Sequence, residues 1–191
     1  STYMQFIPIV ERHAQTQSVP DFSVPSEGYG QFLVDVFHEW YAHDVGKVYV
    51  SQFDNLLGQW LGYPSTTCVH QPTCGQSLVT EANGDVYACD HFVYPEYKVG
   101  NLTQQPLTEI VLSSKQQQFG LEKSQKLTAL CRRCEFRKLC YGGCPKHRFI
   151  SLENEPNPHN YLCASYRYFF EQTAPYMQAM ARQIRLHPSA A

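Results

Sequence analysis

The sequence has little excess charge of either sign and no apolar segment long enough to cross a bilayer. Its formal net charge is −2 over 191 residues, so nonspecific binding to nucleic acid is not favoured electrostatically. No run approaches the roughly 20 apolar residues that a membrane-spanning helix requires. The first residues carry no secretion signal. These absences predict a cytoplasmic protein with no nucleic-acid or membrane partner.

Low-complexity segments and internal repeats are also missing, so we expect an ordinary packed core. Hydrophobic residues make up 43% of the chain and aromatic residues 14%. The N-terminal part predicts a buried strand over residues 4–10, a loop over 13–24, a helix over 26–42, a strand over 47–53 and a short helix over 54–62 ending at Gly62. This order of strand, helix and strand is typical of an α/β unit. Because the chain opens on such a strand, we expect it to be cut from a longer protein.

From Pro64 onward turn residues and cysteines accumulate, and we place a domain boundary there, dividing the chain into residues 1–63 and 64–191. Residues 78–89 predict a β-hairpin with Asn83-Gly84 as a type I′ turn. We expect a helix over 106–119 and mostly loops and short helical turns over 121–163. A last helix begins at Cys163, is interrupted at Pro175 and resumes to about Leu186, and the last five residues are predicted to be disordered.

Eight cysteines are the main chemical feature of the chain. Four of them form the run Cys131-x2-Cys134-x5-Cys140-x3-Cys144, and the others are Cys68, Cys74, Cys89 and Cys163. Four disulfides are the alternative for a secreted chain, but C-x2-C spacing without a secretion signal favours metal binding. Thiolates suit zinc or the iron of an iron–sulfur cluster. Eight ligands make two complete four-cysteine sites.

The division of the eight ligands has two solutions. In the first, the run from Cys131 to Cys144 forms one site alone. In the second, Cys144 joins the site near the hairpin and Cys163 takes its place, as the fourth cysteine of a run does in two-cluster ferredoxins. Spacing alone leaves both solutions open.

The cysteine pattern resembles a known family. Cys74-x9-Gly84-x4-Cys89, followed by the central run and then by Cys163, matches the SPASM signature of radical S-adenosylmethionine (radical SAM) enzymes. Cys68, the segment 89–95, the segment 99–101 and Cys140-Tyr-Gly-Gly-Cys144-Pro145 resemble the anaerobic sulfatase-maturating enzymes in particular. The implied fold is α+β: the end of a partial (β/α) barrel over residues 1–63, then a cysteine-rich SPASM domain over 64–191. That domain would hold a β-hairpin, short helices and loops around two metal clusters.

The resemblance implies two auxiliary 4Fe–4S clusters that transfer electrons and help to position substrate. The first set of ligands would be Cys68, Cys74, Cys89 and Cys144. The second set would be Cys131, Cys134, Cys140 and Cys163. The implied reaction is the oxidation of a cysteine or serine of a sulfatase polypeptide to formylglycine, with an external electron donor or acceptor. S-adenosylmethionine and a third 4Fe–4S cluster would belong to a part of the protein that this chain lacks.

Two other functions remain open: a SPASM domain of another peptide-modifying radical SAM enzyme, and a noncatalytic binding module stabilised by zinc. The C-x3-C-x2-C loop of radical SAM chemistry is absent, because the spacing after Cys140-x3-Cys144 leads to His147. We therefore expect residues 1–191 alone not to cleave S-adenosylmethionine.

Several further residues are candidates for the site. Asp90 occupies the position of the family's proposed base, and a local backbone contact is the alternative. His91 could transfer a proton, although a structural hydrogen bond is favoured. His70 and His147 are weaker candidates for ligands. The remaining candidates are Arg132, Arg133, Arg137 and Lys138 as charges near the second set, Gly142 and Gly143 as a turn that aims two sulfurs apart, and Gln5 and Phe6 as residues near substrate. We expect the aromatic residues 166–170 to pack in the core.

Overall fold

The computed structural model describes residues 1–13, 16 and 18–187. The predicted strand–helix–strand unit is present: β1 (Tyr3–Met4) pairs in parallel with β2 (Tyr49–Val50), and α1 (Gly28–His43) connects them. α2 (Ser51–Leu61) follows and ends as predicted, with Gly62 in the left-handed region at φ 100°.

Both predicted strands are wrong in length. The first, expected over residues 4–10, ends at Met4, because the backbone of Phe6 is instead held by side chains: its carbonyl accepts hydrogen bonds from the Tyr29 hydroxyl (2.7 Å) and from the Gln52 amide. The second, expected over residues 47–53, ends at Val50, because Ser51 already begins α2.

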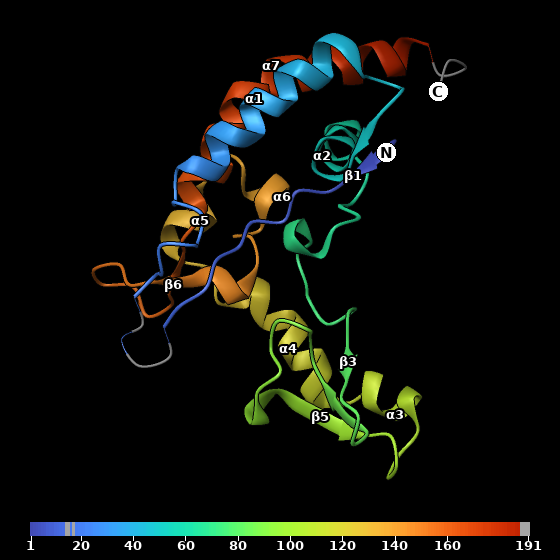
Figure 1. Ribbon diagram of the computed structural model, residues 1–191, viewed down its shortest axis with the longest axis vertical. Coiled ribbons are helices and arrows are strands. Elements are labelled where there is room, and N and C mark those ends of the chain that lie inside the picture. Colours follow the sequence, from blue (N-terminus) through green and yellow to red (C-terminus); the bar gives the residue numbers. More distant parts are fainter. Residues whose placement is uncertain (14–15, 17, 188–191) are drawn as a thin grey trace.

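α7 (Cys163–Leu186) packs along α1 and α2, and the two long helices α1 and α7 lie side by side at one end of the molecule (Figure 1). The predicted interruption at Pro175 is wrong, since α7 continues through it. A proline inside a helix costs about 3 kcal/mol or more. Phe169, Phe170 and Met177 are buried on both sides of Pro175, and their packing outweighs that cost. The prediction that residues 166–170 pack in the core is confirmed for Tyr166, Phe169 and Phe170 and is wrong for Tyr168, which is exposed.

The opposite end of the molecule is a three-stranded antiparallel sheet formed by β3 (Val79–Thr80), β4 (Asp85–Tyr87) and β5 (Lys98–Asn101), in that order. The predicted hairpin is confirmed, but its turn is not type I′. Gly84 alone has positive φ, and Asn83 instead accepts the Asp85 amide through its side chain at 3.0 Å. A three-residue loop with a left-handed glycine results.

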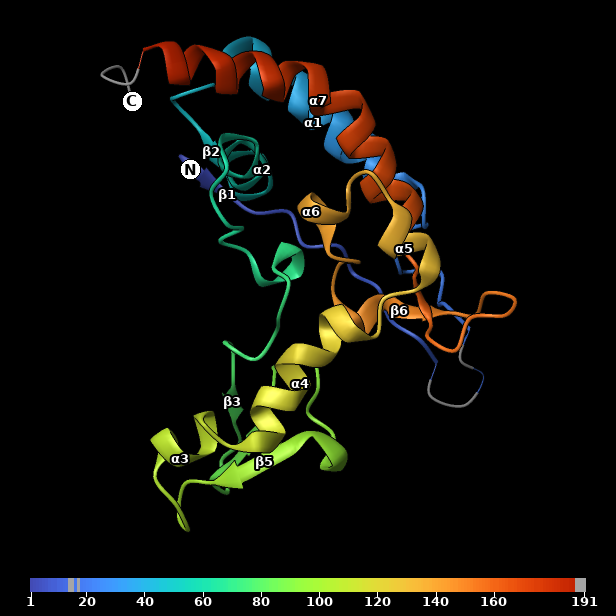
Figure 2. The ribbon, with the colours of Figure 1, turned by 180° about the vertical axis from the view of Figure 1, so that it is seen from behind.

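The helix predicted over residues 106–119 is split into α3 (Leu107–Val111) and α4 (Ser114–Gln125). The Ser113 hydroxyl accepts the Gln116 amide at 3.2 Å and so caps a new helix. α4 extends between the three-stranded sheet and the cysteine-rich centre (Figure 2).

Short elements surround that centre. They are η1 (Cys68–His70), η2 (Pro95–Tyr97), α5 (Ala129–Arg133), α6 (Arg137–Cys140), η3 (Pro145–His147), β6 (Arg148–Ile150) and β7 (His159–Asn160), with β6 and β7 antiparallel. The chain is thus a mixed α and β structure. No helix in the described ranges has the length and apolarity to span a membrane. The predicted disorder at the C-terminus falls on residues 187–191, of which 188–191 lie outside the described residues.

Candidate metal centres

α4 positions the loop that carries Cys68 and Cys74. The buried Lys123 donates hydrogen bonds from Nζ to the carbonyls of Cys68 and Val69. The Cys74 amide donates to the Gly120 carbonyl at 3.1 Å. A Cβ on Gly120 would lie 2.6 Å from the Cys74 carbonyl oxygen, so only glycine allows this approach.

The other two cysteines of the first set come from different elements. Cys89 follows β4, and Cys144 precedes η3. Burial raises the pKa of the Cys89 thiol to about 12, and Asp90 and Cys144 add to this rise. Burial likewise raises the pKa of Cys144 to about 11, and the nearby Cys74 and Cys68 also raise it. The Cys144 thiol and the other three thus influence one another's pKa, which agrees with the predicted first set.

The second set gathers around an open pocket of about 280 Å³. Cys131 lies in α5, Cys134 directly follows it, Cys140 ends α6 and Cys163 begins α7. Burial raises the pKa of Cys140 to about 12 with contributions from Cys163 and Cys131. It raises that of Cys163 to about 11, with contributions from Cys131 and Cys134.

A turn of three left-handed residues separates Cys140 from Cys144. Tyr141, Gly142 and Gly143 have φ of 48°, 72° and 62°. A Cβ on Gly143 would lie 2.6 Å from Asn160 Nδ2. The predicted glycine turn is therefore present, and its role in aiming the two sulfurs at different centres remains a prediction.

Asp90 is exposed and lies beside the first set. Its Oδ1 accepts hydrogen bonds from the Cys89 thiol at 3.1 Å and from the His91 amide at 3.0 Å. A thiolate has no proton to donate, so deprotonation of Cys89 would remove one of these bonds. His91 Nδ1 lies 3.6 Å from the Cys144 sulfur. Asp90 and His91 thus adjoin two cysteines of this set.

The other histidines predicted as weak candidates are buried. His70 packs edge-on against Tyr166 and Phe170, with ring centroids 5.3 Å and 5.9 Å apart, and burial lowers its pKa to about 4. Burial also lowers the pKa of His147 to about 4. Both rings are therefore neutral near pH 7 and serve packing in this structure.

The remaining candidates lie at the periphery. Arg132, Arg133, Arg137 and Lys138 are exposed, and two of them, Arg133 and Arg137, line the pocket of the second set. Gln5 is exposed, and the Phe6 ring packs edge-on against Phe32 at 5.1 Å. Phe6 is thus part of the packing around α1.

Sequence reasoning missed three residues near the cysteines. His159 Nδ1 lies 3.1 Å from Thr128 Oγ1 and 3.7 Å from the Cys131 sulfur. Lys123 and Arg148 are mostly removed from solvent and bind backbone carbonyls. No motif marks these residues, because their partners are backbone atoms or residues distant in sequence.

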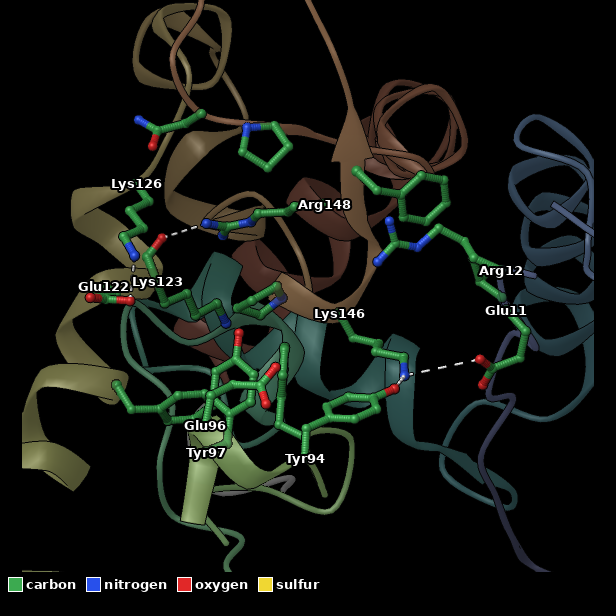
Figure 3. A pocket seen from close by; sticks show the side chains of 17 residues that line it. Glu11, Arg12, Tyr94, Glu96, Tyr97, Glu122, Lys123, Lys126, Lys146 and Arg148 are labelled. Atoms are coloured by element: carbon green, nitrogen blue, oxygen red, sulfur yellow. Dashed lines mark hydrogen bonds and ion pairs between the residues drawn. The ribbon is translucent and has the colours of Figure 1, made fainter. Parts of the chain in front are cut away.

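A larger cavity of about 690 Å³ lies between residues 10–12, α4 and the segment 145–149. Figure 3 shows Lys146 within it, donating to the Tyr94 hydroxyl at 2.9 Å and lying 4.0 Å from the Glu11 carboxylate. The Arg12 guanidinium lies 4.7 Å from the centroid of the Phe149 ring. The wall of this cavity thus carries acidic, basic and aromatic side chains.

The cysteine-rich part of the chain is similar to a known domain family. Residues 68–135 match the family model SPASM, described as an iron-sulfur cluster-binding domain. A serine-type anaerobic sulfatase-maturating enzyme of Bacteroides thetaiotaomicron is 42% identical over 95% of this chain and 47% of its own length. Residues 68–135 are thus similar to a SPASM domain, and the chain is similar to the anaerobic sulfatase-maturating enzymes.

The similarity extends beyond the SPASM domain to almost the whole chain. A cysteine-type enzyme of Clostridium perfringens is 31% identical over 96% of this chain and 50% of its own length. A solved structure described as native anSMEcpe with bound AdoMet and Cp18Cys peptide has a TM-score of 0.82 and 31% identity, covering 96% of this chain and 51% of that one. The chain therefore spans about half the length of the relatives that it matches.

Proposed function

We propose that this chain forms the SPASM-containing part of a radical SAM oxidoreductase that converts a cysteine or serine of a sulfatase polypeptide to formylglycine. In this proposal residues 1–63 close a partial barrel, residues 64–191 form the SPASM domain, and the two sets of cysteines each bind a 4Fe–4S cluster. The observation that carries the proposal is the presence of eight free cysteines in a relative of sulfatase-maturating enzymes.

The spacing of the donor side chains argues against a single zinc ion in either set. Four thiolates on one zinc at about 2.3 Å place their sulfurs within about 4 Å of one another. In the described part of the chain, no group of three or more cysteine, histidine or acidic side chains is close enough to hold one ion. Ligands of a 4Fe–4S cluster each bind a different iron and so stand farther apart. The raised pKa values of Cys140 and Cys144 also fit thiols that need a metal centre to become thiolates.

When bound, the clusters would accept and pass electrons. The residues of this chain would hold and shield them: four cysteines ligate each cluster, which leaves no open iron for substrate. Asp90 would take the proton of the substrate thiol or hydroxyl once the β-carbon has lost a hydrogen atom, using the oxygen that a deprotonated Cys89 no longer engages. The external electron donor or acceptor would exchange electrons with one of these centres.

Metal analysis tests the core of this proposal. Protein reconstituted without oxygen should contain about eight iron atoms and about eight sulfides per chain, four for each cluster. Two zinc ions per chain, with no iron or sulfide after reconstitution, would instead establish the zinc-stabilised module. The alternative is that the enzyme makes a different modification in a peptide. Mass spectrometry of the modified peptide distinguishes that modification from formylglycine.

Asp90→Asn should lower formylglycine yield at least about 100-fold in the full enzyme, because general-base catalysis contributes about 10² to 10⁴. Asparagine keeps the size and the contact with the His91 amide but cannot take a proton. The measurement is formylglycine per peptide, with iron content as the control for intact clusters. A yield equal to that of the unaltered enzyme at equal iron content would exclude the base role.

A further inference from the structure

Arg148 binds the turn that separates the two sets of cysteines. Its guanidinium donates to the carbonyls of Lys123 (2.7 Å), Tyr141 (2.8 Å), Gly142 (3.1 Å) and Gly143 (3.3 Å). The planar fork of an arginine suits several such bonds at once, and lysine cannot reproduce them. Arg148 therefore fixes the conformation of the chain between Cys140 and Cys144.

The charge of Arg148 has no acidic partner. None of the ion pairs among the described residues includes Arg148 or its neighbour Lys123. Figure 3 shows the two side chains together, with the Arg148 guanidinium against the Lys123 carbonyl. Removing two cations from water without an anion is costly. The structure thus holds positive charge that needs a negative centre nearby.

Thiolates bound to the proposed clusters would supply that negative charge, and the two cations differ in which cysteines lie near them. Burial lowers the pKa of Arg148, but Cys131 and Cys140 of the second set and Cys74 and Cys144 of the first set oppose this. The cysteines that most raise the pKa of Lys123 belong to the first set: Cys74, Cys144 and Cys68. Arg148 therefore faces both sets, and Lys123 faces one.

We propose that Arg148 is a positioning residue shared by both centres: it holds the Tyr141–Gly143 turn and places one positive charge between the two sets of cysteines. This inference rests on the proposed cluster binding. A nearby cation stabilises the more negative, reduced state of a cluster and so raises its reduction potential. Arg148 would raise both potentials, and Lys123 would raise that of the first cluster only.

The test compares Arg148→Gln, Arg148→Lys and Lys123→Met in the reconstituted protein, by iron content and by potentiometric titration followed by electron paramagnetic resonance. Cys134→Ala with Cys163→Ala, which disables the second set, assigns the signals. Arg148→Gln should lower both midpoint potentials, and Lys123→Met should lower only that of the first cluster. Arg148→Lys should keep both potentials close to those of the unaltered protein, because the charge remains.

Two results would overturn the inference: unchanged potentials in Arg148→Gln at full iron content, or a shift confined to one cluster. If Arg148→Gln does not fold, Arg148→Lys tests the positioning role. Lower iron content in that variant supports this role, because lysine keeps the charge but not the bonds to the turn, and full iron content contradicts it. Failure of the unaltered protein to bind iron would refute the proposed function itself, which is a separate outcome.

Discussion

Replacing Cys144 with alanine should remove nearly all remaining iron from a variant in which Cys134→Ala and Cys163→Ala have already disabled the second set. The same replacement should change little in a variant whose first set is disabled by Cys74→Ala and Cys89→Ala. This result is expected because Cys74 and Cys68 raise the pKa of Cys144, although Cys144 belongs to the central run in sequence. Iron and sulfide per chain, with the absorption spectrum of the clusters, measure the effect.

Cys140→Ala is the matched control, since Cys140 lies in the same run, on the other side of the turn from Cys144. It should show the reverse dependence, removing iron only where the second set is intact, because Cys163 and Cys131 are its neighbours. Equal behaviour of Cys140→Ala and Cys144→Ala would show that the run Cys131–Cys144 forms a single site. The partition proposed here would then be wrong.

Gly30→Ala should lower the free energy of unfolding by about 1–3 kcal/mol, the usual cost of overpacking. Gly30 lies where α1 crosses α7, and an added Cβ would lie 2.6 Å from the Ser165 carbonyl oxygen and 2.7 Å from its Cα. Both helices would have to separate, because the contact is with backbone. The Gly30 amide would also move from the Ser165 hydroxyl, which now accepts it at 2.8 Å. Denaturant unfolding followed by circular dichroism gives the change.

Gly58→Ala provides the comparison, since Gly58 lies in α2 and an added Cβ meets nothing within 4 Å. It should raise the free energy of unfolding by about 0.5–1 kcal/mol, because alanine loses less conformational entropy in a helix. Both unfolding experiments use protein in the same metal state, since bound metal contributes to folding. If the two variants have equal stability, the close crossing of α1 and α7 does not constrain residue 30.

Local sequence signals predicted those elements whose causes are local. The left-handed cap at Gly62 and the hairpin around Gly84 follow from the conformational freedom of glycine. Ser113 carried a signal for the start of α4 that competed with the apolar pattern of the single predicted helix. The turn at Asn83 required knowing whether its side chain would bind the backbone.

Elements decided by distant contacts could not be predicted in the same way. Pro175 predicts a break, and only the packing of α7 against α1 and α2 shows why the helix continues. The cysteine spacing predicts ligands, and that prediction stands untested, whereas Lys123 and Arg148 bind carbonyl groups, which every residue has. A sequence without coordinates cannot show which carbonyls a buried cation will meet.

Cys163 is the first residue of the long helix α7. The helix has 24 residues and is therefore about 36 Å long at 1.5 Å per residue. Near its far end, Arg185 donates to the Trp60 carbonyl at 2.9 Å, at the last turn of α2. If Cys163 moved, α7 would have to shift where it packs against α1. The position of Cys163 and the packing of α1 and α2 therefore depend on the same helix.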